Sequence, residues 1–401
     1  MKQRNKTILF IIALIFTSIC LRGPIASLGS LIDLIEPDLG VSKGPLGFIT
    51  TLPLLVFAAS SLLLPKIANS IGHTRILVMG MLLLAVGCYV RTMSGYVIVL
   101  IGTFLVGVGI SVGNVLISGI IKENMPLKIG LATGVYMCFQ NLAATAGAGL
   151  SHPIAHALDL GWRNVLSLWT VPGIIATIAW IVFGHYNRKQ NEEKLDDVIS
   201  PSEIKKEKIM WTSKLAWSIT IVMGTQSVNY YCVTAWLPSI LKESDMSFQT
   251  AGLVASAFQL FAIPATFVAP IAISHIKSKS LPAVASGILY IIGILILLST
   301  DSIPLILIAL LFLASGGGAS FAWVVAIIAM VSKDSHEATR LSGMSQSVGY
   351  LMAAIAPTLA GTLYEITDSW IPVMIIAISM SLLIITFSLS TGRLLQNGAH
   401  L

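Results

Sequence analysis

The sequence predicts an all-α membrane protein with twelve transmembrane helices, arranged in two six-helix bundles around a central cavity. Three observations lead to this fold class: the composition, the recurrence of long apolar runs, and a duplication of the chain. Of the 401 residues, 55% are hydrophobic and 10% are charged, and the mean hydropathy is +0.87. A water-facing surface needs far more charge, so the composition excludes a soluble protein.

Apolar runs long enough to cross about 30 Å of hydrocarbon recur along the chain. We place the twelve helices at 7–32, 46–69, 75–92, 96–121, 129–155, 163–185, 213–238, 249–273, 281–299, 303–331, 339–362 and 370–391.

The distribution of basic residues predicts the orientation. With the N-terminus inside, nineteen Lys and Arg lie in inner segments and four in outer segments (Lys43, Arg91, Arg163 and Lys242), and Arg22 completes the 24. Because inner loops of membrane proteins are enriched in Lys and Arg, we expect a multi-pass protein of the plasma membrane with both termini cytoplasmic.

A polar stretch divides the chain. Residues 185–214 read HYNRKQNEEKLDDVISPSEIKKEKIMWTSK, and their mixed charge is typical of a cytoplasmic linker. We therefore predict an N-terminal bundle over 1–184, a linker over 185–212 and a C-terminal bundle over 213–401. The linker is short for an independently folded domain.

The two halves of the chain are similar in sequence. A shift of 205 superposes the run at 40–68 on the run at 245–272, and a shift of 209 superposes GVGIS (107–111) on GGGAS (316–320). Single matches between glycine-rich apolar segments arise by chance, but several at nearly constant offset indicate duplication. Six spans, a charged linker and six similar spans are the arrangement of the major facilitator fold, in which two bundles rock about a site near the midplane.

The chain resembles the cyanate/nitroimidazole transporter family of the major facilitator superfamily over nearly its whole length. The residues that carry the resemblance are LRGPI (21–25), TTLPLL (50–55), GNVLI and IK (113–122), TGVYMCFQN (133–141), GTQSVNYYCVTAWLPSIL (224–241) and LSGMSQSVGYLMAAIAPTLAG (341–361). The resemblance implies a transporter of a small solute, and the family's substrates include cyanate and 2-nitroimidazole.

One motif departs from the superfamily pattern. Between spans two and three, major facilitators typically carry Gly-x-x-x-Asp-Arg-x-Gly-Arg-Arg, a charged latch that takes part in gating. This chain has Asn69 and Ser70 at the Asp-Arg positions and keeps Gly72. We expect the charged latch to be reduced or absent.

Arg22 is the strongest candidate for a binding residue. It is the only charge in the apolar run from Ile8 to Ile32, and a guanidinium inside the bilayer costs at least a few kcal/mol. All eighteen acidic residues lie in predicted loops or at span ends, so Arg22 lacks an internal counter-ion and favours an anionic or electron-rich ligand. The alternative is a structural role, in which Arg22 reaches outward or binds carbonyls freed by Gly23-Pro24.

Other polar side chains inside the spans recur at helical spacing and could hydrogen-bond a polar solute. The alternative for each is a hydrogen bond between packed helices. These candidate substrate-binding residues are Asn114, Tyr136, Gln140, Asn141, Gln226, Asn229, Tyr230, Trp323, Gln346 and Tyr350.

Several other kinds of site find little support. His152 and His156 are four residues apart, but Pro153 interrupts that turn and no third ligand follows, so we expect no metal site. The glycine-rich runs lack the flanking residues of phosphate-binding loops. No buried acid–base pair or nucleophile dyad indicates an enzyme, and we expect no cofactor.

We therefore expect a secondary transporter that moves a small anionic or electron-rich solute by alternating access. Its partners would be that solute and the lipid bilayer, with no nucleic acid, and the chain would act as a monomer. Proton coupling stays open, although no predicted membrane-buried carboxylate could carry the proton. The alternatives are a membrane sensor that signals through the linker and, within transport, efflux rather than uptake.

Overall fold

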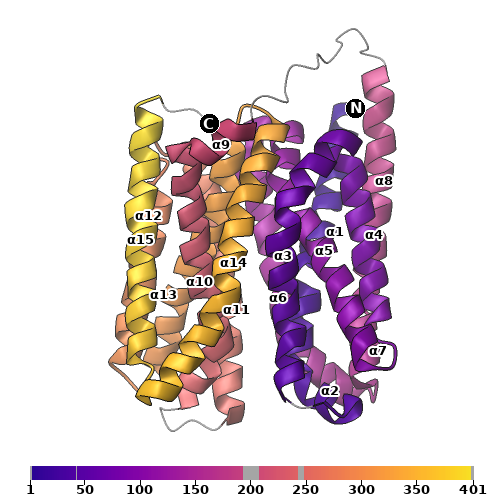
Figure 1. Cartoon of the computed structure of the whole chain (residues 1–401). Coiled ribbons are helices and arrows are strands. Elements are labelled where there is room, and N and C mark those ends of the chain that lie inside the picture. Colours follow the sequence, from indigo (N-terminus) through magenta and orange to yellow (C-terminus); the bar gives the residue numbers. More distant parts are fainter. Residues whose placement is uncertain (1, 42, 193–206, 243–247, 399–401) are drawn as a thin grey trace.

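The computed structural model describes residues 2–41, 43–192, 207–242 and 248–398, and all regular secondary structure in these ranges is helical (Figure 1). The long helices of the first half are α1 (Lys2–Ser30), α3 (Lys43–Ile71), α4 (His73–Val90), α5 (Tyr96–Asn124), α6 (Ile129–Ala157) and α8 (Thr170–Glu192). Those of the second half are α10 (Lys214–Lys242), α11 (Phe248–His275), α12 (Leu281–Leu298), α13 (Ile303–Val331), α14 (Ser335–Thr367) and α15 (Ile371–Gln396). The short elements are α2 (Ile32–Leu39), η1 (Pro126–Lys128), α7 (Gly161–Ser167) and α9 (Glu207–Thr212).

The predicted fold class is confirmed, because eleven of the twelve predicted spans each correspond to one long helix and the sixth corresponds to α7 and α8 together. Ten helical segments in the described ranges are long and apolar enough to cross a membrane. The two long helices outside that set are α6 and α10, whose amide and hydroxyl side chains lower their hydropathy. They are also the helices that carry most of the candidate binding residues.

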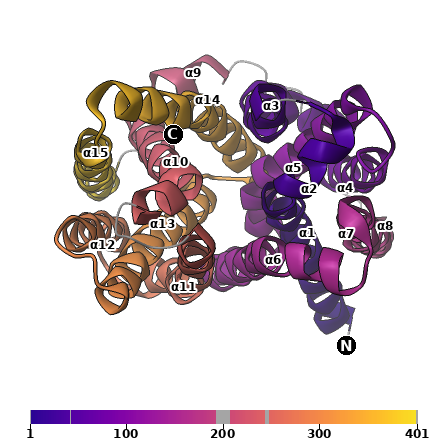
Figure 2. The same ribbon diagram turned by 90° about the horizontal axis from the view of Figure 1, so that it is seen from below.

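The helices form two bundles that meet along two seams (Figure 2). At one seam α6 packs against α11, and at the other α3 and α5 pack against α14. We call the end of the molecule where α1 begins and α15 ends the linker face, because the ends of α8 and α9 lie there too (Figure 1). The apolar core is shared between helices within each bundle and across the seams.

The sixth predicted span is interrupted. The helix stops after Ser167 and resumes at Thr170, because the ring of Pro172 would clash with the carbonyl of Leu168 in a continuous helix. At its other end α8 runs on to Glu192, beyond the predicted start of the linker at residue 185. Residues 193–206 lie outside the described residues, so the predicted domain boundaries stay a prediction.

Sequence reasoning missed helix α2, which follows the first span at the face opposite the linker. Its Asp38 forms an ion pair with Arg163 of α7, with 2.5 Å between Oδ2 and Nη1. This pair joins the segment after the first span to the start of the sixth span.

Counting Arg91 among the basic residues of the outer segments says nothing of its side chain, which the structure places inside the bundle. Arg91 follows the last residue of α4 and is fully buried, with Nη1 donating to the carbonyl of Pro24 at 3.0 Å. Gly102 of α5 permits this, because a Cβ there would overlap the backbone of Arg91. The Arg91 side chain therefore turns back into the bundle and binds α1 through the carbonyl of Pro24.

The seam between α3, α5 and α14 is tightly packed toward the linker face. A Cβ at Gly119 would lie 2.6 Å from the carbonyl oxygen of Ser335, and a Cβ at Gly343 would lie 2.6 Å from that of Ser61. Real Cβ atoms do not approach so closely, so the backbones touch only because both residues are glycine.

Hydrogen bonds of amide, hydroxyl and imidazole groups occupy the place of the charged latch. His336 Nδ1 donates to Asn69 Oδ1 at 2.6 Å, and His73 Nε2 lies 3.0 Å from Thr339 Oγ1. The end of α3 and the start of α4 therefore contact α14 through hydrogen bonds.

Gly343→Leu is expected to open this seam, because its side chain overlaps Ser61 and Pro65 of α3. Overpacking costs about 1–3 kcal/mol, which corresponds to roughly a 5- to 150-fold shift between closed and open forms. The measurement is the labelling rate of a cysteine at position 61 by a membrane-impermeant maleimide added from the linker face. Gly149→Leu is the control, since a Cβ there meets nothing within 4 Å. Equal labelling rates for wild type and Gly343→Leu would contradict the expectation.

Candidate functional site

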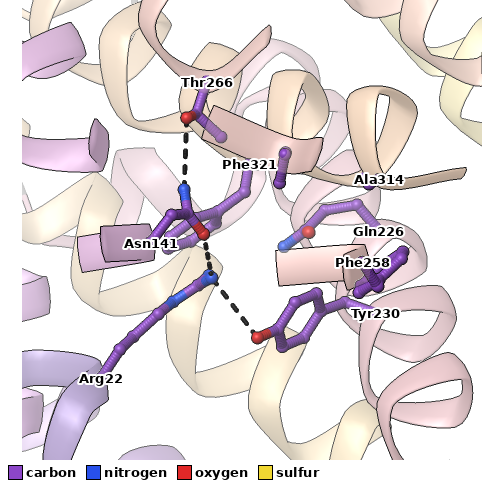
Figure 3. A pocket seen from close by; sticks show the side chains of 11 residues that line it. Arg22, Asn141, Gln226, Tyr230, Phe258, Thr266, Ala314 and Phe321 are labelled. Atoms are coloured by element: carbon purple, nitrogen blue, oxygen red, sulfur yellow. Dashed lines mark hydrogen bonds between the residues drawn. The ribbon is translucent and has the colours of Figure 1, made fainter. Parts of the chain in front are cut away.

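A small cavity lies between the two bundles, with Arg22 on its wall (Figure 3). Helices α1 and α6 of the first bundle and α10, α11 and α13 of the second contribute to it. The lining residues are Arg22, Asn141, Gln226, Tyr230, Phe258, Ala262, Thr266, Ala314, Gly317, Gly318 and Phe321. The cavity measures about 10 Å³, which is room for about one water molecule. The bundles must therefore part before a larger solute can enter.

The Arg22 guanidinium points across the interface toward the second bundle (Figure 3). Its Nη1 donates to Asn141 Oδ1 at 3.0 Å and to the Tyr230 hydroxyl at 3.4 Å. Its Cζ lies 4.8 Å from the Tyr230 ring centroid and 5.4 Å from that of Phe321. The side chain therefore does not reach outward to solvent, and the Pro24 carbonyl is bound by Arg91 instead.

All the partners of Arg22 in the described part of the chain are neutral. Its electrostatic neighbours are the phenols Tyr136, Tyr230, Tyr231 and Tyr350. No carboxylate lines the cavity or forms an ion pair with Arg22 among the described residues. Cation–π contacts and neutral hydrogen bonds stabilise a guanidinium, but they leave its full positive charge in place.

Asn141 connects Arg22 to the second bundle. Its Oδ1 accepts from Arg22, and its Nδ2 donates to Met137 O at 3.0 Å and to Thr266 Oγ1 at 3.2 Å. Tyr230 also accepts from Gln259 Nε2 at 2.9 Å. Asn141 and Tyr230 are thus held in place by neighbours on α6 and α11, with their oxygens turned to the guanidinium.

A second group of candidate residues forms a network centred on Asn114 of α5. Asn114 Oδ1 accepts from the Tyr136 hydroxyl at 2.8 Å and from Gln140 Nε2 at 3.3 Å. Across the interface, Asn114 Nδ2 donates to the Tyr350 hydroxyl at 3.4 Å, and Gln346 Nε2 donates to the backbone carbonyl oxygen of Asn114 at 2.8 Å. These residues are buried, and the network lies outside the cavity lining.

Gln226 lines the cavity, whereas the candidates Asn229 and Trp323 do not. Asn229 Nδ2 donates to Ser381 Oγ of α15 at 3.0 Å, and Trp323 Nε1 donates to the Lys279 carbonyl at 2.7 Å. Neither side chain lines the cavity: Asn229 joins α10 to α15, and Trp323 joins α13 to the segment between α11 and α12. Both contacts match the alternative of hydrogen bonds between packed helices of one bundle. Helical periodicity puts Asn229 on the same face of α10 as Gln226 and Tyr230. That face is wide enough for Gln226 and Tyr230 to line the cavity while Asn229 contacts α15.

Sequence reasoning missed several neighbours of Arg22. Phe258, Phe321, Ala262 and Ala314 carry no polar signal that separates them from ordinary lipid-facing or core residues. Gln259 was detectable as an amide within an apolar span, and Tyr231 as the second phenol of a pair.

Trp169 supports α1 next to Arg22. The break between α7 and α8 directs its indole against Gly23, where a Cβ would overlap the six-membered ring. Its Nε1 donates to Ser27 Oγ at 2.7 Å. Gly23 therefore allows the indole to fix the segment of α1 that carries Arg22.

Gly23→Ala is expected to lower stability by about 1–3 kcal/mol, because the new methyl group displaces the indole. The measurement is the thermal unfolding midpoint. Gly29→Ala on the same helix is the control, since a Cβ there meets nothing within 4 Å. Gly23→Ala combined with Trp169→Leu should recover part of the loss, and a destabilisation that is unchanged in the double variant would refute the clash.

Comparisons with known proteins agree with this architecture. A family model described as Major Facilitator Superfamily matches residues 9–357 and 225–393. The chain is 34% identical to the uncharacterized transporter YycB of Bacillus subtilis over 96% of this chain and 93% of that protein. It is 30% identical to the 2-nitroimidazole transporter of Escherichia coli, over 97% and 96% of the two chains.

More distant relatives share the fold. The cyanate transport protein CynX of Escherichia coli is 21% identical over 90% of this chain and 91% of that protein. The crystal structure of the major facilitator transporter FucP in the outward conformation superposes with a TM-score of 0.74 at 11% identity, over 96% of this chain and 98% of that one. The chain therefore belongs to the major facilitator superfamily of secondary transporters, in the group that includes the 2-nitroimidazole and cyanate transporters of Escherichia coli.

Proposed function

We propose that this transporter carries a small anionic or electron-rich polar solute, similar to cyanate or a nitroimidazole, and that Arg22 is its charge-recognition group. The single observation behind the proposal is the Arg22 guanidinium at the bundle interface, which has only neutral partners among the described residues. The names of the nitroimidazole and cyanate relatives support the same class of solute.

The physical argument is that a membrane-buried cation without a counter-ion attracts an anion. An arginine fork bound to a carboxylate-like or other anionic group makes charge-assisted hydrogen bonds, which are roughly twice as strong as neutral ones. The attraction is greatest where little water surrounds the charges, and the cavity of about 10 Å³ beside Arg22 has room for about one water molecule. Asn141 and Tyr230 would then orient the guanidinium and contact the solute beside it.

Alternating access requires the polar contacts between the bundles to break and re-form. The bonds from Arg22 to Tyr230, from Asn141 to Thr266 and from Asn114 to Tyr350 all cross the interface. Interhelical hydrogen bonds in membranes average only about 0.6 kcal/mol. The interface can therefore separate without the loss of a strong ion pair, and a bound anion would replace the neutral partners of Arg22.

The test is a binding and transport screen of purified protein. Small anions, weak acids and nitroheterocycles are added singly, binding is measured by thermal shift, and uptake by proteoliposomes is measured in both directions. We expect at least one anionic or nitro compound to bind and be transported, and its neutral saturated analogue to be inert. If only cations or neutral sugars are transported, the proposal is wrong.

We also propose that the linker face is cytoplasmic, as the distribution of Lys and Arg suggests. Single cysteines at Lys128 and at Asp368, which lie at opposite ends of the bundles, test this in intact cells. Only the cysteine at position 368 should react with an impermeant maleimide, and the reverse pattern would invert the topology.

A further inference from the structure

A second, larger cavity lies apart from the cavity that Arg22 lines, at the linker face. It measures about 650 Å³ and opens to the surroundings between α3, α9 and α14. Its lining residues are Ser61, Leu62, Leu63, Pro65, Lys66, Met210, Trp211, Thr212, Arg340 and Met344. It therefore lies where the two bundles meet and where the short helix α9 crosses the seam.

The lining combines two cations with apolar side chains. Lys66 comes from the first bundle and Arg340 from the second, and no carboxylate is among the lining residues that the structure describes. Leu62 and Leu63 are 45% and 60% exposed on the outer surface of α3. Such exposure of leucine next to a cavity is expected where hydrocarbon chains, not water, are the surroundings.

The cavity lies near the linker-face ends of α3 and α14, where we expect the boundary between hydrocarbon and headgroups. Lys66 lies five residues before the end of α3 and Arg340 five residues after the start of α14, both at the linker face. Trp211 is 44% exposed on α9, and tryptophan is enriched at this boundary because its ring is amphipathic. Basic pockets between helices on the cytoplasmic side of membranes bind anionic lipid headgroups.

We propose that this cavity binds one anionic phospholipid, with its phosphate between Lys66 and Arg340 and an acyl chain along Leu62 and Leu63. The lipid bridges the two bundles at the seam that is closed in this structure. It thereby favours the conformation in which the linker face is closed.

The test uses full-length, delipidated protein titrated with dioleoylphosphatidylglycerol, with binding followed by native mass spectrometry. Wild type should bind one lipid preferentially and should bind dioleoylphosphatidylcholine more weakly. Lys66→Gln combined with Arg340→Gln should weaken phosphatidylglycerol binding about thirtyfold, roughly fivefold for each cation removed. The matched control is Lys128→Gln with Lys277→Gln, which removes the same charge from the same face at the other seam. An equal loss in the control would show nonspecific attraction and overturn the proposal.

Three further experiments distinguish the proposed lipid from a free anion, from the chain's own acidic segment, and from a lipid bound elsewhere on the protein. Inorganic phosphate or soluble glycerophosphoglycerol should not compete at lipid-like concentrations, and competition would show a site for a free anion. Neutralising Glu192, Glu193, Asp196 and Asp197 in the linker should leave lipid affinity unchanged, whereas a tenfold rise would show that the chain's own acidic segment fills the cavity. Phosphatidylglycerol with brominated acyl chains should quench less fluorescence in Trp211→Phe than in wild type, and equal quenching would place the lipid elsewhere.

Discussion

Replacing Arg22 with glutamine is expected to abolish high-affinity solute binding while the protein still folds. Removing one partner of a buried, hydrogen-bonded charge pair costs about 2–5 kcal/mol, which is a loss of at least thirtyfold in affinity. The neutral glutamine keeps hydrogen-bonding capacity toward Asn141 and Tyr230, so the interface is preserved. The measurement is the dissociation constant of the transported solute, by calorimetry or by competition, with thermal unfolding as the check of folding.

Arg22→Lys separates charge from geometry. Lysine keeps the positive charge but lacks the planar fork and stacks less well on Tyr230 and Phe321. We expect an intermediate affinity, about tenfold below wild type. If both variants bind and transport as wild type does, Arg22 has no role in recognition.

Asn141→Asp should block anion binding without removing any cation. The substitution is nearly isosteric, and it would place a carboxylate where Oδ1 now lies 3.0 Å from Arg22 Nη1. The resulting ion pair supplies Arg22 with an internal counter-ion, and the new negative charge repels an anionic solute by several kcal/mol. We expect at least a tenfold loss of affinity.

The stability of Asn141→Asp distinguishes this mechanism from simple damage. An ion pair with Arg22 should leave the thermal midpoint unchanged or raise it, although the donor to Thr266 is lost. Asn229→Asp is the matched control, because Asn229 bonds to α15 away from the cavity and should keep wild-type affinity. Undiminished anion binding by Asn141→Asp would contradict the account, whatever its stability.

Much of the fold could be predicted from sequence because the bilayer imposes strong constraints. Every spanning segment must satisfy its own backbone hydrogen bonds and be apolar over about 20 residues, so the twelve helices are visible as runs. Helix ends are less constrained. Pro172 was a readable reason for the break before α8. Nothing in the sequence shows that the side chain of Arg91, at the end of the third predicted span (75–92), turns back into the bundle.

The site was only partly predictable, because sequence shows which residues are unusual but not which helices they meet. Arg22 is conspicuous as a lone charge, and its amide and phenol partners Asn141 and Tyr230 are conspicuous as polar groups. Asn229 and Trp323 are equally conspicuous, yet their hydrogen bonds go to neighbours in the same bundle. Phe258 and Phe321 were invisible, since an apolar side chain against a cavity and one against lipid look alike in sequence.

The most direct test compares a small weak acid with its neutral amide of the same shape, on wild type and on Arg22→Gln. Wild type should bind the ionised acid at least thirtyfold more tightly than the amide, and Arg22→Gln should lose this preference while its affinity for the amide changes little. A charge preference that survives in Arg22→Gln, or is missing in wild type, would contradict the claim that this guanidinium recognises the negative charge of the solute.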